Sequence, residues 1–519
     1  MEPLQIVWFK RDLRLVDHGP LLLASRLGPV LPLVVVEPEL WRQPDASARQ
    51  WHFCRESLEE LRTELAALGQ PLVVRVGQVT AVLERIQRHW PIAGLWSHQE
   101  TGNGWTYARD RRVAAWARQH GIAWTELPSF GVIRRLASRD GWARRWEALM
   151  AESLQTAPRR LRPLEMVAPG VLPTAAELGL APDPCPFRQP GGRRAGLALL
   201  ESFLQQRSCR YQRGLSSPLT AFESCSRLSA HLAWGTLSLR EVVQRSRLRR
   251  AELHARSAAA DGAWARALGR FEERLHWHCH FIQKLESEPR LEFEELHPLT
   301  AGLRQSDAAR LAAWADGRSG IPFVDACMRC LNASGWLNFR MRAMLQSVAT
   351  YQLWLPWRDS GLVLARLFVD YEPGIHWSQC QMQAGTTGIN TIRIYNPIKQ
   401  GQEHDPDGAF IRRWLPELRG LPGLRCHEPW MLSRACQERY GCRLGQDYPE
   451  PIVAVAEAAR LARERLWSLR RQEGFATHAD AIQARHGSRR AGLRASAGRR
   501  GGRRPAGTSS AEQLLLDLG

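Results

Sequence analysis

The sequence lacks a long apolar run. Although 44% of its 519 residues are hydrophobic, no apolar stretch reaches the ~18 residues that are typical of a membrane-spanning helix. The apolar residues near the start are interrupted by charges in MEPLQIVWFKRDLRL, which is not typical of a signal peptide. We therefore expect a cytoplasmic protein with no membrane partner. The length exceeds the ~250–300 residues at which a single core stops growing, so it predicts more than one domain.

Two common phosphate-binding loops are also missing. There is no G-x-G-x-x-G motif and no Walker loop, which argues against a standard NAD or P-loop site. The chain has 11 cysteines, but disulfides are rare in the cytoplasm. Cys327 and Cys330 form a C-x2-C pair within a stretch that is typical of a buried helix, so we interpret them as core thiols. No metal site is expected.

Basic residues, in contrast, are abundant. The formal net charge is +19, which favours polyanionic partners, nucleic acid first and an anionic membrane second. Part of the excess falls in residues 479–519, where Arg499, Arg500, Arg503 and Arg504 lie among glycines. This low-complexity composition predicts a disordered tail that could add nonspecific affinity for nucleic acid.

Residues 1–135 alternate between strand-like and helical patterns. Short continuous apolar runs predict strands at Ile6–Phe9, Leu31–Val36, Pro71–Gly77, Gly94–Gln99 and Ile122–Leu127. Amphipathic segments such as Ala48–Leu68 lie between them. Apolar strands that alternate with helices predict an α/β domain with a doubly wound parallel sheet, which is Rossmann-like.

The remainder of the chain predicts a linker and a helical domain. Residues 136–195 contain a stretch rich in Pro, Arg and Gly, which is typical of a long connector. Across residues 196–472, apolar residues recur at i, i+3, i+4 and i+7, which predicts an all-helical domain. The expected fold class is therefore α/β plus all-α.

The segment from Arg366 to Leu418 carries the most informative pattern. In order, its parts are Asp370 and Glu372, a Gly- and Thr-rich turn, Asn396-Pro397, Asp405-Pro406, Gly408 and the run Phe410–Leu418. Alone, each piece is ordinary turn or helix-start chemistry. In this order and spacing, they resemble the flavin-binding core of the photolyase/cryptochrome family.

The opening WFKRDLRLVDHGPL resembles a signature of the same family, with His18 where relatives usually carry Asn. The resemblance runs from about Gln5 to about Leu469. It implies an α/β antenna domain followed by a helical FAD-binding domain. In this family the first domain can hold an antenna chromophore, a folate or a deazaflavin, and the sequence does not choose between them. The alternative for the charged residues of the opening is a structural role between strand ends and loops.

The resemblance also implies which residues hold FAD. Those that it places against the phosphates are Tyr211, Ser226, Arg227, Leu228 and Ser229. Cys225 departs from the usual Thr, and a Ser-rich helix cap is the alternative interpretation. By the same resemblance Arg342 pairs with Asp370 near the flavin ring. Glu372 replaces the second Asp of the family and could still accept a hydrogen bond.

His376 falls where relatives place Asn or Asp against the flavin, and a His there could gate proton transfer near neutral pH. An ordinary buried His is the alternative. Of three Trp that carry electrons to the flavin in the family, only Trp357 has a counterpart. Cys380 and Arg304 stand at the other two positions, although Trp377, Trp354 and Trp336 lie nearby in sequence.

In the substrate pocket that the resemblance implies, Trp277 matches a dimer-contacting Trp. Arg274, Phe339 and Ala343 stand where photolyases carry Glu, Asn and Met. We expect an enzyme that repairs ultraviolet-damaged DNA in light, by electron transfer from reduced FAD to a pyrimidine dimer. The alternatives are a cryptochrome-like blue-light photoreceptor and a nucleic-acid-binding module that keeps flavin only as structure.

The end of the chain suggests a further partner. Residues Gln513 to Leu518 resemble the peptide that docks on bacterial sliding clamps. The alternative is a frayed amphipathic end. We expect the protein to be a monomer.

Overall fold

A five-stranded parallel sheet forms the core of the amino-terminal part of this computed structural model, which describes residues 4–164, 167–256 and 259–487. The strands are β1 (Leu4–Phe9), β2 (Val30–Val36), β3 (Val73–Val76), β4 (Ile92–His98) and β5 (Ala123–Leu127). Their order is β3-β2-β1-β4-β5, and every neighbouring pair is parallel. The prediction of a doubly wound sheet is confirmed. Ligands of such sheets bind beyond the carboxyl ends of the strands.

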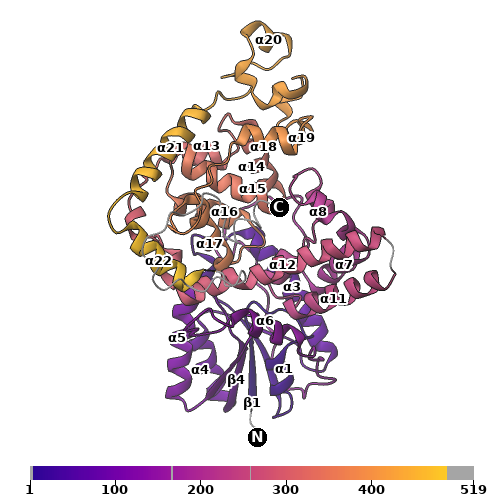
Figure 1. Cartoon of the computed structure of the whole chain (residues 1–519). Helices are drawn as coiled ribbons and strands as arrows, with labels where there is room; N and C mark the ends of the chain where they lie inside the picture. Colours follow the sequence, from indigo (N-terminus) through magenta and orange to yellow (C-terminus); the bar gives the residue numbers. More distant parts are fainter. Residues whose placement is uncertain (1–3, 165–166, 257–258, 488–519) are drawn as a thin grey trace.

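Helices connect the strands and cover the sheet (Figure 1). They are α1 (Gly19–Ala24), α2 (Pro38–Trp41), α3 (Ala48–Ala67), α4 (Val79–His89) and α5 (Gly104–Gln119). The helix predicted at Ala48–Leu68 is present as α3. It begins with a capping box in which Ser47 and Gln50 satisfy each other's backbone N–H groups. β1 is buried along its whole length, as its continuous apolar sequence requires.

The predicted linker is partly helical. Within residues 136–195, α6 (Trp142–Ala151) buries Trp142, Trp146 and Met150, which lie on one helical face. The high Pro and Gly content of the later residues concealed this spacing. Residues 152–164 and 167–192 contain no helix or strand, and their Leu161, Leu172 and Leu178 pack into the core of the α/β part.

The rest of the chain is helix-rich, as predicted, and lies above the sheet in Figure 1. Its α-helices are α7 (Arg193–Gln205), α8 (Tyr211–Gly214), α9 (Ala221–Ser224), α10 (Ser229–Ala233), α11 (Leu239–Ala255), α12 (Ala259–Ser287), α13 (Ala308–Ala315), α14 (Pro322–Ser334), α15 (Phe339–Ser347), α16 (Trp357–Leu367), α17 (Pro373–Ala384), α18 (Pro397–His404), α19 (Ala409–Trp414), α20 (Arg434–Arg439), α21 (Val455–Arg470) and α22 (Phe475–His486).

Helix α22 corrects the expected start of the tail. The sequence predicted disorder from residue 479, yet α22 continues to His486. Phe475, Ile482 and His486 of this helix are buried, and Phe475 stacks on His297 at 3.9 Å between ring centroids. Burial of these side chains stabilises a helix that its composition alone would not predict. Residues 488–519, with the clamp-like peptide, lie outside the described residues.

The two parts meet where β1 ends. Arg11 Nε donates to Ala233 O at 2.9 Å, and Arg11 Nη2 donates to Tyr371 O at 2.6 Å. Gly235 has φ +66°, and a Cβ there would lie 2.3 Å from Arg11 O. Only glycine permits both this backbone conformation and this approach. Arg14 is buried and donates to Gly235 O at 3.1 Å, so the structural role considered for the charged opening holds for this residue.

Candidate functional site

A cavity of about 330 Å³ opens within the helical part. Its wall combines the loop before α10 with residues of α12, α15 and α17. The predicted site residues that line it are Tyr211, Ser226, Arg227, Leu228, Ser229, Trp277, Arg342, Asp370, Glu372 and His376. Residues more than 160 positions apart in sequence, such as Tyr211 and His376, therefore share one chamber. Trp357 does not line it.

The wall holds buried polar atoms that have no hydrogen-bond partner among the described residues. They are Ser229 Oγ, Trp277 Nε1, Asn338 Oδ1, Gln346 Oε1 and Gln379 Nε2. A buried polar atom left unpaired costs about 1–3 kcal/mol. Such atoms gathered around one cavity indicate a polar ligand that completes them. Sequence reasoning missed Asn338, Gln346 and Gln379, because an amide on a helix carries no local signal of the cavity that it faces.

The predicted ion pair between Arg342 and Asp370 is present. Arg342 Nη1 and Nη2 donate to the two carboxylate oxygens at 3.0 and 2.7 Å. The guanidinium also lies 4.0 Å from the centroid of the Phe368 ring, and its Nε donates to Leu337 O at 2.7 Å. This bidentate, stacked geometry fixes a cation on the cavity wall.

Arg227 places a second cation on the wall. Its backbone has φ +61°, which is uncommon outside glycine and concentrates at functional sites. Its guanidinium lies 4.2 Å from the Trp336 ring centroid and 4.6 Å from that of Phe222. Burial lowers the pKa of Arg227 to about 10, so it remains charged at neutral pH. One buried cation, Arg227, and one partly exposed cation, Arg342, suit an anionic ligand.

Burial shifts the pKa values of Glu372 and His376 in opposite directions. Burial lowers the pKa of His376 to about 4, and its Nε2 donates to Gly361 O at 2.8 Å. The ring is therefore neutral, and proton gating by His376 near pH 7 is not supported. Burial raises the pKa of Glu372 to about 7, although Arg11 Nη2 lies 3.8 Å from its Oε2. Glu372 is the group of this pair that titrates near neutrality.

Aromatic side chains form the apolar side of the cavity. Trp277 packs with Phe281 at 5.7 Å between ring centroids, and Met382 completes this cluster. Arg274 also lines the cavity, with its guanidinium 5.6 Å from the Phe339 ring centroid. A planar group could stack in this space.

Trp357 lies one aromatic layer behind the wall. Its ring centroid is 5.8 Å from that of Trp377, which in turn lies 4.8 Å from the His376 ring. Cys380 and Trp336 line the cavity themselves. Arg304 is buried beside Trp354, 4.9 Å from its ring centroid.

One cluster outside the cavity has the ligand types of a metal site. Asp12, His18 and His98 offer atoms that all lie within 4.8 Å of one another. However, His18 Nδ1 accepts from Leu21 N, so its Nε2 carries the proton and donates to Asp12 at 3.0 Å. His98 Nδ1 lies 2.7 Å from the same oxygen. The ligand atoms that could bind a metal ion are therefore already engaged in hydrogen bonds with one another and with the backbone.

Comparison with known proteins identifies the family. Residues 5–133 match the family described as DNA photolyase, and residues 271–468 match the FAD binding domain of DNA photolyase. The chain is 32% identical over 477 residues to the deoxyribodipyrimidine photo-lyase of Streptomyces griseus, covering 89% of this chain and 98% of the relative. This protein belongs to the photolyase/cryptochrome family.

Other relatives of this family agree. Cryptochrome DASH of Gloeobacter violaceus is 31% identical over 494 residues, which is 88% of this chain and 94% of the relative. The crystal structure of a Synechocystis cryptochrome superposes with a TM-score of 0.80 at 25% identity, over 89% of this chain and 99% of that one. A bacterial class III photolyase from Agrobacterium tumefaciens, at 24% identity and a TM-score of 0.78, shares the fold over 91% of this chain and 98% of its own.

FAD is the cofactor of this family's helical domain, and the cavity fits it. A pyrophosphate needs a cation and hydroxyls, which Arg227, Ser226 and Ser229 offer. A planar ring needs flat apolar walls with polar groups at its edges, which the aromatic residues and the unpartnered amides offer. Among the described residues, no helix is both long and apolar enough to cross a bilayer.

Proposed function

We propose that this protein is a DNA photolyase, which repairs a pyrimidine dimer in light. Bound FAD supplies the light-absorbing, redox-active ring. The observation that carries the proposal is that Trp277 and the residues expected to hold FAD line the same cavity. A base extruded from DNA into this cavity would therefore stack on an aromatic wall beside the cofactor.

In this proposal, different residues of the site have different roles. Tyr211, Ser226, Arg227, Leu228 and Ser229 hold the phosphates, and Arg342 with Asp370 orients the ring edge and biases its redox state. Glu372 supplies a carboxyl group that titrates near neutrality. His376 offers an unprotonated Nδ1, because its Nε2 proton is donated to Gly361 O. Trp357 passes electrons inward through Trp377, the ring that it contacts.

We propose domain boundaries as the sequence suggested them, with the α/β domain at 1–135, the connector at 136–195 and the FAD domain at 196–472. A second cavity of about 110 Å³ lies between β1, β2 and the helical part, and Trp8, Trp41, Asn103 and Arg109 help to line it. This position, beyond the carboxyl ends of the strands, favours it as the place of an antenna chromophore.

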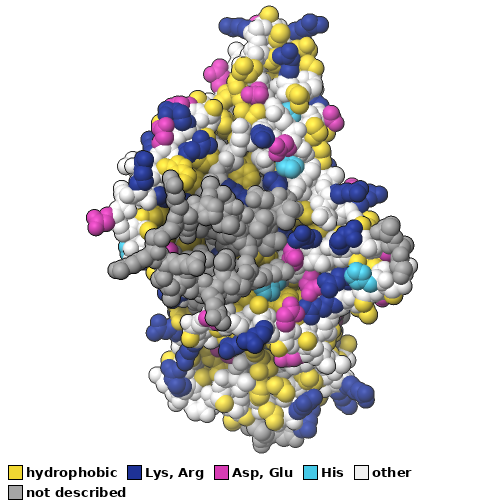
Figure 2. All heavy atoms as spheres, in the orientation of Figure 1, with side chains coloured by type: hydrophobic (Ala, Val, Ile, Leu, Met, Phe, Trp, Pro, Cys, Tyr) yellow, Lys and Arg dark blue, Asp and Glu magenta, His cyan; other side chains and the backbone are white. Residues whose placement is uncertain are grey.

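The proposed substrate is ultraviolet-damaged DNA. Several relatives are named for action on dipyrimidines, and the net charge of +19 favours a polyanion. On the part of the face in Figure 2 that is not covered by grey residues, Lys and Arg side chains lie at many separate places rather than in one patch. We also propose that Gln513–Leu518 docks on a sliding clamp, and that the protein is a monomer in the cytoplasm.

A light-dependent repair assay tests the proposal. Protein with bound FAD, chemically reduced beforehand, is illuminated with DNA that carries defined cyclobutane or (6-4) lesions. We expect loss of one lesion in light only, and loss of this activity in Trp277→Ala. The control is Trp467→Ala on α21, where the ring is 52% exposed. Absence of repair with FAD bound and reduced would contradict the proposal and favour the photoreceptor alternative.

A further inference from the structure

A small cavity of about 30 Å³ lies between the FAD cavity and the α/β part. Its wall includes Lys10, Asp12, His98, Glu100 and Glu372. A buried water needs roughly 10–15 Å³ of such space and several polar partners, so this cavity can hold water. Glu372 lines both this cavity and the FAD cavity. Glu372 therefore lies between the two cavities.

Ser129 adds an independent sign of water in the small cavity. This residue lines the cavity, and its buried Oγ has no hydrogen-bond partner within the described ranges. The loop that carries Ser129 follows β5, whereas Glu372 caps the start of α17. A water molecule between these elements would satisfy the hydroxyl.

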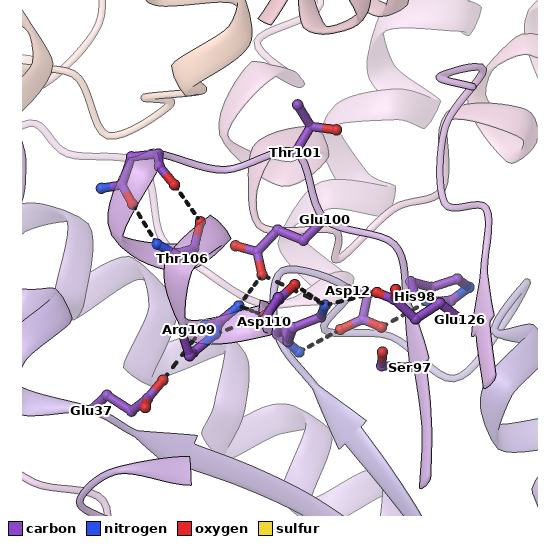
Figure 3. Close-up of polar contacts among 12 residues, drawn as sticks. Asp12, Glu37, Ser97, His98, Glu100, Thr101, Thr106, Arg109, Asp110 and Glu126 are labelled. Carbon is purple, nitrogen blue, oxygen red and sulfur yellow. Dashed lines mark hydrogen bonds and ion pairs between the residues drawn. The ribbon is translucent and has the colours of Figure 1, made fainter. Parts of the chain in front are cut away.

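A charge cluster adjoins the small cavity through Lys10 and Glu100, and Figure 3 shows its acidic members Glu100, Asp110 and Glu126. Lys10 Nζ lies 3.2 Å from Asp110, 3.6 Å from Glu126 and 3.8 Å from Glu100. Side-chain exposure rises outward, from 8% for Glu372 and 9% for Glu100 to 18% for Glu126. Burial raises the pKa of Glu126 as well. Carboxyl groups with raised pKa values therefore stand at both ends of the route.

The surroundings of Glu372 let it hold either charge state. The titratable and charged groups that share a cavity wall with it are Lys10, Arg11, Asp12, His98 and Glu100 on the small-cavity side, and Tyr211, Cys225, Arg227, Arg274, His278, Arg342, Asp370, Tyr371, His376 and Cys380 on the FAD side. Burial and Glu100 favour the protonated carboxyl, whereas Arg11 favours the carboxylate. These opposing effects place its pKa at about 7.

We propose that Glu372 transfers protons between the FAD cavity and solvent, through water in the small cavity and the carboxyl group of Glu126, which lies 3.6 Å from Lys10 on the wall of that cavity. When an external reductant gives an electron to bound FAD, Glu372 gives one proton to the cofactor and becomes a carboxylate beside Arg11. A proton that enters at Glu126 and crosses the water restores the carboxyl group. The inference rests on FAD binding and not on DNA repair, so the two can fail separately.

Infrared difference spectroscopy of FAD-loaded protein, reduced minus oxidised, tests the donor. In spectra recorded at short times after reduction near pH 6.5, we expect transient loss of a protonated carboxyl C=O band that recovers as the proton from Glu126 arrives, and absence of this change in Glu372→Gln. Glu292→Gln is the matched control. Burial also raises the pKa of Glu292 to about 7, but Glu292 lines neither cavity. Persistence of the band change in Glu372→Gln, or its disappearance in Glu292→Gln, would overturn the proposal.

Proton uptake from solvent tests the route. A pH-indicator dye records uptake after rapid chemical reduction, while FAD absorbance records electron arrival. We expect Glu372→Gln to slow the uptake roughly 10²-fold, the lower range for loss of a positioned proton donor. Glu126→Gln should also slow proton uptake. Because Glu126 does not line the FAD cavity, this variant tests the route even if Glu372→Gln binds no FAD. Proton uptake at the wild-type rate in Glu126→Gln would exclude Glu126 as the point at which protons enter.

Discussion

Two buried polar regions of this protein meet the cost of burial in opposite ways. At the carboxyl ends of β2 and β4, Arg109 Nη2 lies 2.6 Å from Glu100 and 2.8 Å from Asp110, and its Nη1 lies 3.6 Å from Glu37 (Figure 3). These carboxylates hold the pKa of Arg109 above its usual range. In the FAD cavity, by contrast, Ser229 and Gln379 keep buried polar atoms that have no partner in the described part of the chain. The first region supports the fold by itself, and the second requires its ligand.

The largest effect should come from removing Arg109, the cation of the region at the strand ends. We expect Arg109→Met to lower the free energy of unfolding by about 3–5 kcal/mol, because buried carboxylates lose their partner. The affinity for FAD should change little. Urea unfolding and FAD titration measure the two quantities. Arg111→Met, an exposed position on the same helix, is the control. If the free energy of unfolding fell by less than about 1 kcal/mol, as expected for an exposed ion pair, the idea that this region stabilises the fold without a ligand would be contradicted.

A smaller, pH-dependent effect is expected at Glu292, a buried carboxyl group near Asp45. Burial and Asp45 raise its pKa to about 7 from an ordinary value of 4.5. Between these values the unfolded state loses its proton first, so wild-type stability falls as pH rises from 4.5 to 7 and is level above. Glu292→Gln should therefore be more stable than wild type at pH 8, by up to about 3 kcal/mol, and should gain nothing at pH 4.

Urea unfolding of the apo-protein at the two pH values measures this difference. Glu294→Gln provides the comparison, because the Glu294 side chain is 65% exposed and should show no such pH dependence. Equal stability of Glu292→Gln and wild type at pH 8 would show that this carboxyl group ionises normally in the fold.

The smallest effect should come from the FAD cavity, where buried polar atoms lack a partner until a ligand binds. We expect Ser229→Ala to weaken FAD binding roughly 5–10-fold, about 1–1.4 kcal/mol for one hydrogen bond. Stability of the apo-protein should stay the same or rise slightly, because an unpaired hydroxyl is removed. Ser360→Ala is the inverse control, since Ser360 Oγ already donates to Trp357 O at 3.2 Å. If Ser229→Ala destabilised the apo-protein as much as Ser360→Ala, the comparison would fail.

Local patterns were sufficient for much of the fold. The five strands and helix α3 follow from apolar runs and from a capping sequence, which act over a few residues. Helices α6 and α22 were missed because each depends on a buried apolar face within a Pro-, Gly- or Arg-rich context. There, tertiary packing overrides composition.

By itself the sequence determined the family and the fold class, and it pointed to many of the residues that line the FAD cavity, because motifs in a fixed order and spacing carry the resemblance residue by residue. Only the tertiary structure decided which of those residues titrates near neutrality. His376 is the residue with the ordinary pKa near 7, yet burial makes it neutral, while Glu372 rises to about 7. The convergence of Asn338, Gln346 and Gln379 on one cavity was decided in the same way. Desolvation and convergence depend on neighbours that are distant in sequence, and no local pattern encodes them.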